Sequence, residues 1–222
     1  MTQLVILFII LLLTVESLQV IQFFKTLNFF KVLPFQKGRD LSSSSSIMNK
    51  STVLFPSAEY NFKWGALDDV VMGGQSKSSL TTTSNNELEW SADVTTANNG
   101  GFAGIRTQPF GTINASKSTG ISMKCIGDGG RFKIIIRDSV EWNGVAWSYS
   151  FDTKANSEIN IKVPFTNFIP TKFAKRVQVP AFDSSQFSAI QCTYSKFEYD
   201  DKLNPTFSEG KKNFIIKQIS LY

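Results

Sequence analysis

From Phe55 to Tyr222, hydrophobic positions either alternate with polar ones or form short runs between turn residues. Segment 88–94 alternates strictly, which places apolar side chains on one face of a strand and polar ones on the other. No stretch keeps an apolar period of 3.6 residues, so helices are not expected to organise this part. We therefore predict an all-β fold, an antiparallel jelly-roll sandwich. The expected strands are 88–94, 102–106, 121–126, 131–138, 147–151, 159–163, 190–194 and 214–221.

The first 50 residues follow a different pattern. Positions 4–13 are consecutive apolar residues, too few to span a bilayer but suited to the hydrophobic region of a secretory signal. A basic, serine-rich stretch with Asp40 as its only acid follows, which is typical of a two-part plastid targeting sequence. The alternatives are an ordinary signal peptide, a membrane anchor, a mitochondrial presequence, or translation that starts at Met48. We expect residues 1–50 to be a targeting segment and residues 55–222 to be the folded domain.

The charge is unevenly distributed along the chain. The sequence holds 23 basic and 18 acidic residues, a net charge of +5, and five of the basic and two of the acidic residues lie in the first 55 positions. The remainder is nearly neutral, with a net charge of +2. A basic face that binds nucleic acid is therefore not expected, because that mode of binding depends on clustered cations.

The sequence contains no histidine. This excludes Ser-His-Asp and Cys-His catalysis as well as zinc sites that use histidine ligands. Cys125 and Cys192 both lie in expected strands, so two buried, reduced thiols are the simplest interpretation. A disulfide between them in an oxidising compartment is the alternative. We expect no catalytic residue, no metal ligand and no cofactor.

Segment 68–76 is the most unusual local pattern, since two aspartates lead into an apolar run and then a glycine pair. Adjacent side chains on an extended backbone point in opposite directions, so Asp68 and Asp69 cannot act together as a general acid and base. The glycine pair indicates backbone angles that a side chain would disfavour. A structural corner or a partner surface is expected here, and contact with a calcium ion or another ligand is the alternative.

A second element, 98–106, combines asparagine and glycine in a predicted tight turn that runs into a strand ending at Arg106. We hypothesise that Arg106 pairs with Asp68 or Asp69, which would join both elements in one polar cluster. Segment 127–131 lacks the order of a phosphate-binding loop and predicts a hairpin turn. The candidate structural or partner residues are Asp68, Asp69, Met72, Gly73, Gly74, Ser76, Asn99, Gly100, Gly101, Arg106, Asp128 and Arg131.

These motifs, in this order, resemble those of the complex I intermediate-associated protein 30 family. The resemblance covers about 62–222 and rests on four ordered motifs. Two departures occur: the family's frequent Asn-Asp before Val-Met-Gly-Gly is Leu67-Asp68-Asp69-Val70 here, and its usual Arg-Gly after Phe-x-Pro is replaced by Thr171-Lys172-Phe173. The motifs are Val71-Met72-Gly73-Gly74-Gln75-Ser76 after Trp64 and the aspartates, Asn98-Asn99-Gly100-Gly101-Phe102-Ala103 with Arg106, Gly127-Asp128-Gly129-Gly130-Arg131-Phe132, and Pro164-Phe165 with Phe168 and Pro170.

The resemblance implies a galactose-binding-like β-sandwich and a non-enzymatic role. Members of the family are assembly factors, or chaperones, for respiratory NADH:ubiquinone oxidoreductase in the mitochondrion. Implied partners are subunits and assembly intermediates of a membrane electron-transfer complex and other assembly factors, and peripheral contact with a membrane stays open. A plastid location with a photosynthetic client is one alternative. A carbohydrate-binding module is the other, with Trp142, Trp147 and Tyr149 as candidate stacking residues, although alternating aromatics in strands more often belong to a core.

Overall fold

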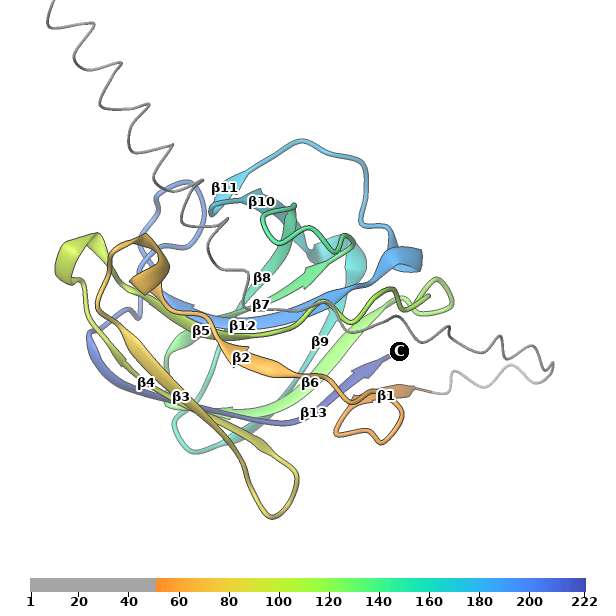
Figure 1. The fold of residues 1–222 in the computed structure, drawn as a ribbon, viewed down its shortest axis with the longest axis horizontal. Helices are drawn as coiled ribbons and strands as arrows, with labels where there is room; N and C mark the ends of the chain where they lie inside the picture. The colour runs from red at the N-terminus through yellow and green to blue at the C-terminus, as the bar shows by residue number, and fades with distance from the viewer. Residues whose placement is uncertain (1–50) are drawn as a thin grey trace, which may run out of the picture. The chain divides into compact units, whose positions relative to one another are not determined.

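The computed structural model describes residues 51–222, which form two stacked antiparallel β-sheets (Figure 1). The first sheet has the order β3-β4-β13-β6-β9, and β1 also pairs with β13; the second has the order β11-β10-β8-β7-β12-β5-β2. The strands of the first sheet are β1 (Thr52–Phe55), β3 (Lys77–Thr82), β4 (Leu88–Val94), β6 (Gly120–Gly127), β9 (Glu158–Pro164) and β13 (Gly210–Leu221). Those of the second are β2 (Trp64–Ala66), β5 (Phe102–Thr107), β7 (Arg131–Arg137), β8 (Ala146–Asp152), β10 (Ile169–Lys172), β11 (Lys175–Arg176) and β12 (Ala189–Ser195). The 3-10 helices of the described part are η1 (Asp69–Met72), η2 (Ala97–Asn99), η3 (Phe165–Asn167) and η4 (Ser184–Gln186).

This architecture confirms the predicted all-β antiparallel sandwich of jelly-roll type. Every expected strand is present, and each observed end lies within four residues of the predicted one. The strands that the pattern did not predict are β1, β2, β3, β10 and β11. Four of these have only two to four residues, which is too short for an alternation to be recognised.

The predicted hairpin at 127–131 is wrong. β6 pairs with β13 and β9 in the first sheet, whereas β7 pairs with β8 and β12 in the second. The turn therefore carries the chain from one sheet to the other, with a φ of +98° at Gly129 and a hydrogen bond of 3.0 Å from the Gly130 N–H to the Asp128 carboxylate. The glycines indicate a sharp turn correctly, but they do not specify whether the flanking strands pair with each other.

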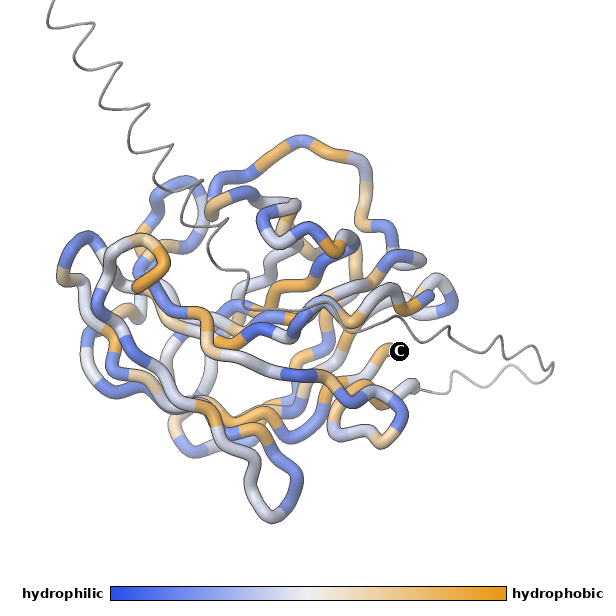
Figure 2. The backbone as a smooth tube through the Cα atoms, in the orientation of Figure 1, coloured by the Kyte–Doolittle hydropathy of each residue, from blue (hydrophilic) through white to orange (hydrophobic). Residues whose placement is uncertain are grey.

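The core lies between the two sheets and follows from the alternation along each strand. On β4, the side chains of Leu88, Trp90, Ala92 and Val94 are buried, while Glu89 and the other intervening side chains face away from the core. Figure 2 shows the same pattern as alternating hydrophobic and hydrophilic colours along the strands. Burial of these apolar faces supplies the main driving force that holds the sheets together.

Phe132 on β7 is the centre of an aromatic cluster in this core. Its ring lies 6.3 Å from Trp90, 6.4 Å from Phe151, 5.3 Å from Tyr194 and 4.7 Å from Phe214, measured between ring centroids. Two of these partners come from the first sheet and two from the second. The cluster therefore links the two sheets directly.

Cys125 on β6 and Cys192 on β12 are free thiols buried in the core, as the simplest interpretation of the sequence predicts. Burial is the main reason that the pKa of Cys125 is raised to about 12 and that of Cys192 is raised well above its usual value. Both thiols therefore stay protonated at neutral pH. A protonated thiol is a poor nucleophile, so neither group is suited to catalysis.

We expect neither thiol of the folded protein to react with an aromatic disulfide reagent at pH 8, because both are buried and protonated. Both should react once guanidinium chloride unfolds the chain. Mass spectrometry of the labelled protein gives the number of modified cysteines in each state. Rapid labelling of Cys125 or Cys192 under native conditions would contradict this burial.

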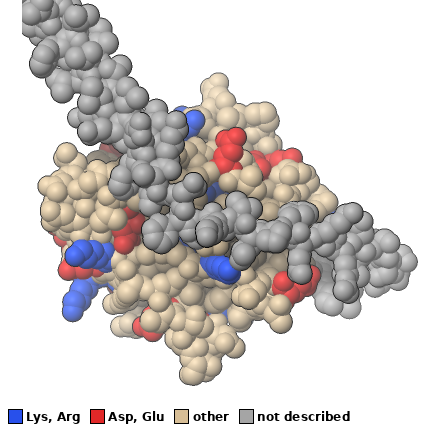
Figure 3. Space-filling view, viewed as in Figure 1, with Lys and Arg blue, Asp and Glu red and all other residues tan. Residues whose placement is uncertain are grey.

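No helix in residues 51–222 is long and apolar enough to cross a membrane. The predicted targeting segment, residues 1–50, lies outside the described residues. On the face drawn in Figure 3, outside the grey atoms, acidic and basic side chains are interspersed rather than gathered in one large patch.

Candidate functional site

The side chain of Asp69, at the start of η1, is the centre of the first candidate element. It is 1% exposed, and its two carboxylate oxygens accept hydrogen bonds from four donors. These donors are the Ser76 N–H at 2.9 Å, the Ser76 hydroxyl at 2.8 Å, the Gly101 N–H at 2.7 Å and the Phe102 N–H at 3.2 Å. The carboxylate thus binds segments 68–76 and 98–106 to each other. We call this arrangement the Asp69 corner.

Two glycines allow the backbone to approach this carboxylate. A Cβ atom on Gly74 would lie 2.3 Å from Asp69 Cγ, and one on Gly100 would lie 2.5 Å from Asp69 Oδ2. Gly73 is different, because a Cβ there would meet nothing within 4 Å, but its φ is +90° where it ends η1. The glycine pair is therefore required for two reasons, conformation at the first position and space at the second.

These two roles predict unequal costs of substitution. Gly73→Ala should lower the free energy of unfolding by about 1 kcal/mol, the strain of a left-handed residue. Gly74→Ala should lower it by about 2 kcal/mol, because the added methyl group overlaps a carboxylate held by four hydrogen bonds. Gly65→Ala, where nothing lies within 4 Å, is the control and should change it by less than about 0.5 kcal/mol. Urea denaturation measures all three, and equal losses at Gly73 and Gly74 would contradict the distinction.

The remaining residues of the two elements surround the corner. Asp68 accepts from the Ser78 N–H at 2.8 Å and from the Ser78 hydroxyl at 2.7 Å, so the two neighbouring aspartates have separate partners. Asn99 has a positive φ of 61° in the turn. The side chain of Met72, by contrast, is 70% exposed. The corner is thus a rigid hydrogen-bonded base from which an apolar side chain projects into solvent.

The hypothesis that Arg106 pairs with Asp68 or Asp69 is wrong. Arg106 projects from the outer face of β5, where its Nη1 donates to the Trp142 carbonyl oxygen at 3.0 Å and its guanidinium lies 4.0 Å above the Trp142 ring. Asp69 instead accepts from the backbone N–H groups of Gly101 and Phe102. The two elements are joined as expected, but by backbone donors that a residue pattern does not distinguish.

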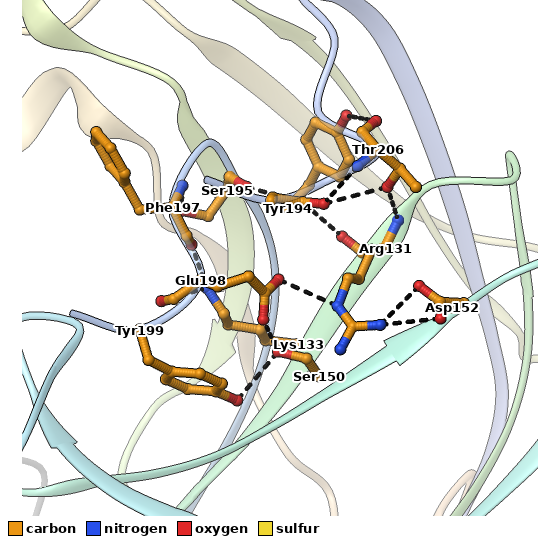
Figure 4. A network of polar contacts seen from close by, with 11 residues as sticks. Arg131, Lys133, Ser150, Asp152, Tyr194, Ser195, Phe197, Glu198, Tyr199 and Thr206 are labelled. Carbon is orange, nitrogen blue, oxygen red and sulfur yellow. Dashed lines mark hydrogen bonds and ion pairs between the residues drawn. The ribbon is translucent and has the colours of Figure 1, made fainter. Parts of the chain in front are cut away.

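Arg131 belongs to a separate polar network on the second sheet (Figure 4). Its Nη1 donates to both Asp152 oxygens, at 2.8 and 2.9 Å, and its Nε forms an ion pair of 3.4 Å with Glu198. Lys133 donates to the carbonyl oxygens of Phe197 and Glu198. No motif in the sequence indicates this network, because its acids come from β8 and from the loop after β12.

The sequence model of the complex I intermediate-associated protein 30 family matches residues 53–209. The chain belongs to this family. The matched range includes the Asp69 corner and the Arg131 network, and it confirms the resemblance inferred from the motifs. A search of the curated proteins finds no match.

This family member is also similar to solved carbohydrate-binding modules. The family 11 module of a cellulosomal cellulase of Clostridium thermocellum has a TM-score of 0.49 and 20% identity, covering 80% of this chain and 95% of that one. A mutant of a family 29 module has a TM-score of 0.45 and 11% identity, covering 78% of this chain and 90% of that one. The agarase AgWH50C has a TM-score of 0.46 and 9% identity, covering 70% of this chain but 23% of that one.

The aromatic residues considered for sugar stacking do not form one exposed platform in this family member. Trp147 is buried and packs edge-on against Phe182, and Tyr149 is half-buried against Phe168. Trp142 alone among the three is exposed, and it lies against Arg106. The carboxylate of Asp69, which was also a candidate for calcium, faces four hydrogen-bond donors, an environment that suits a carboxylate and repels a cation.

Proposed function

We propose that this protein is a non-enzymatic assembly factor that binds incomplete intermediates of respiratory complex I. The match of the family model over residues 53–209 carries this proposal. The hydrogen bonds of the candidate residues agree with a non-enzymatic role, because the polar side chains of the Asp69 corner bind one another or the backbone. A role as a binding surface requires only that a rigid scaffold present specific side chains to a partner.

The Asp69 corner is the proposed contact with such a partner. Val70 and Met72, on η1, are 50% and 70% exposed. Their backbone is fixed by the carboxylate of Asp69 beneath them and by Gly73, which ends the 3-10 helix. A backbone that is already fixed loses little further conformational entropy on binding, so exposed apolar side chains on it suit the recognition of apolar subunit surfaces. Shielding such surfaces until the complex is complete is the chaperone activity that we propose.

The proposed location is the mitochondrion, with residues 1–50 as the targeting segment. A fusion of residues 1–55 to a fluorescent protein tests this location directly. Fluorescence in plastids would contradict it and would redirect the proposal to a photosynthetic complex.

Native electrophoresis of cells that express the full-length protein with a C-terminal tag tests the function. We expect the protein to migrate with subassemblies of complex I, to be absent from the finished complex, and to be required for that complex to accumulate. Normal complex I in cells that lack the protein would overturn the proposal. Binding to a glycan array without migration with any subassembly would favour a carbohydrate-binding module.

Substitution at the corner tests the proposed contact. Val70→Ser combined with Met72→Ser should reduce recovery of the subassemblies at least tenfold without changing the melting temperature. Leu203→Ser, at another exposed apolar residue, is the matched control and should leave recovery unchanged. Equal recovery of the subassemblies with both variants would exclude the corner as the contact. The assembly role itself is tested separately, by complex I in cells that lack the protein.

A further inference from the structure

Strands β5 and β7 place four cationic side chains on the outer face of the second sheet. Arg131, Lys133 and Arg137 alternate along β7 on the side away from the core, and Arg106 lies on β5. Strand β12 lies between β5 and β7, and its residue Gln191 is paired directly with Arg106. Arg106 is 4% exposed and Arg137 is 9% exposed, although charged residues are rarely buried unless they are paired.

One end of this face has its charges balanced. Arg131 contacts the carboxylates of Asp152 and Glu198, and Lys133 donates to carbonyl oxygens of the loop that contains Glu198 (Figure 4). Two cations thus lie beside two acids. This is the ordinary arrangement for cations that serve only the fold.

The other end has no such balance. Within residues 51–222, Arg106 and Arg137 form no ion pair with any acid. Each holds the β7–β8 loop by one nitrogen: Arg106 Nη1 binds the Trp142 carbonyl at 3.0 Å, and Arg137 Nη1 binds the Gly144 carbonyl at 2.8 Å. Burial, with the nearby charge of Arg137, lowers the pKa of Arg106 to about 9. Burial also lowers the pKa of Arg137, to about 10, so both groups stay cationic at pH 7.

Within residues 51–222, several buried side-chain atoms of these two arginines and of the neighbouring Gln191 have no hydrogen-bond partner. They are Nε and Nη2 of Arg106, Nε of Arg137 and the carbonyl oxygen of Gln191. Only Nη1 of each arginine holds the loop, so the contacts with the loop do not account for these atoms. An unpaired buried donor costs about 1–3 kcal/mol, and a charged one costs more. A ligand that neutralises both guanidinium groups would remove this cost.

We propose that Arg106, Arg137 and Gln191 form a binding site for a ligand that carries an oxyanion group, a phosphate or a carboxylate. Guanidinium groups match both oxyanions, because their N–H donors bind two oxygens in parallel. Gln191 donates its side-chain N–H to Thr193 at 2.8 Å, which leaves its amide oxygen to accept a hydrogen bond from a donor on the ligand, such as the hydroxyl of a protonated phosphate. The site is separate from the Asp69 corner and does not depend on the proposed assembly role.

Isothermal titration calorimetry of the full-length protein tests the site, with inorganic phosphate and malonate as probes and sodium chloride at matched ionic strength as the reference. We expect saturable binding at one site for at least one probe. The probe that binds more tightly identifies the oxyanion that the site prefers. Heats equal to those of the chloride reference for both probes would overturn the proposal.

Substitutions locate the binding. Arg106→Gln and Arg137→Gln should each weaken it at least tenfold, whereas Lys124→Gln, which removes an exposed charge from the other sheet, should change it less than twofold. Equal weakening by all three would mean general charge attraction and would overturn the site. Should either arginine variant fail to fold, NMR of the wild-type arginine Nε–H signals replaces it. Phosphate or malonate should then shift two of these signals selectively, and unchanged signals would contradict the proposal.

Discussion

Asp69→Ala is expected to lower the free energy of unfolding by about 4 kcal/mol, a large share of the roughly 5–15 kcal/mol that stabilises a typical domain. The substitution removes a buried acceptor and leaves the N–H groups of Ser76, Gly101 and Phe102 without a partner. Each buried donor left unpaired costs about 1–3 kcal/mol. Urea denaturation followed by tryptophan fluorescence measures the change.

Asp68→Ala is the matched control for this prediction. Asp68 is the same residue type one position earlier, but it is only half-buried and binds the single residue Ser78. Asp68→Ala should lower the free energy of unfolding by about 1 kcal/mol. Similar costs for the two aspartates would show that the Asp69 corner does not connect the two elements as described.

Phe132→Ala is the second large effect, with an expected loss of about 4 kcal/mol. The ring is 1% exposed and contacts aromatic rings from both sheets, so its removal leaves a cavity that neither sheet can fill alone. Thermal or urea denaturation gives the change in stability. Phe173→Ala, at an exposed turn, should change stability by less than about 0.5 kcal/mol. A cost below about 2 kcal/mol at Phe132 would mean that the core collapses around the cavity.

Much of the fold could be predicted from the sequence, and the reason is the length of the strands. β4 and β6 have seven and eight residues, enough for an inside-outside alternation to be recognised. β2 and β11 have three and two residues, and each exists because a longer neighbour offers free backbone groups to pair with. The turn at 127–131 shows the same limit, since strand pairing depends on β13, about 90 positions further along the chain.

The candidate site was predicted less completely. The sequence placed 68–76 beside 98–106 only through the hypothesised pairing of Arg106 with Asp68 or Asp69. It indicated the wrong partner for Asp69, since an arginine is a visible candidate whereas a backbone N–H is present at almost every position. It did not indicate the partners of Arg131, because Glu198 and Asp152 lie in no recognisable motif and are brought to β7 by sheet pairing alone.

The position of β13 affects when the chain can fold during its synthesis. It is the last strand of the sandwich in chain order, yet it lies inside the first sheet, between β4 and β6, and also pairs with β1. A nascent chain that has not reached Gly210 therefore leaves the edges of both neighbours open to pairing with other chains. Folding of the sandwich must wait until synthesis has passed Leu221. A ribosome that stalls within the last strand would release a product prone to aggregation and to degradation.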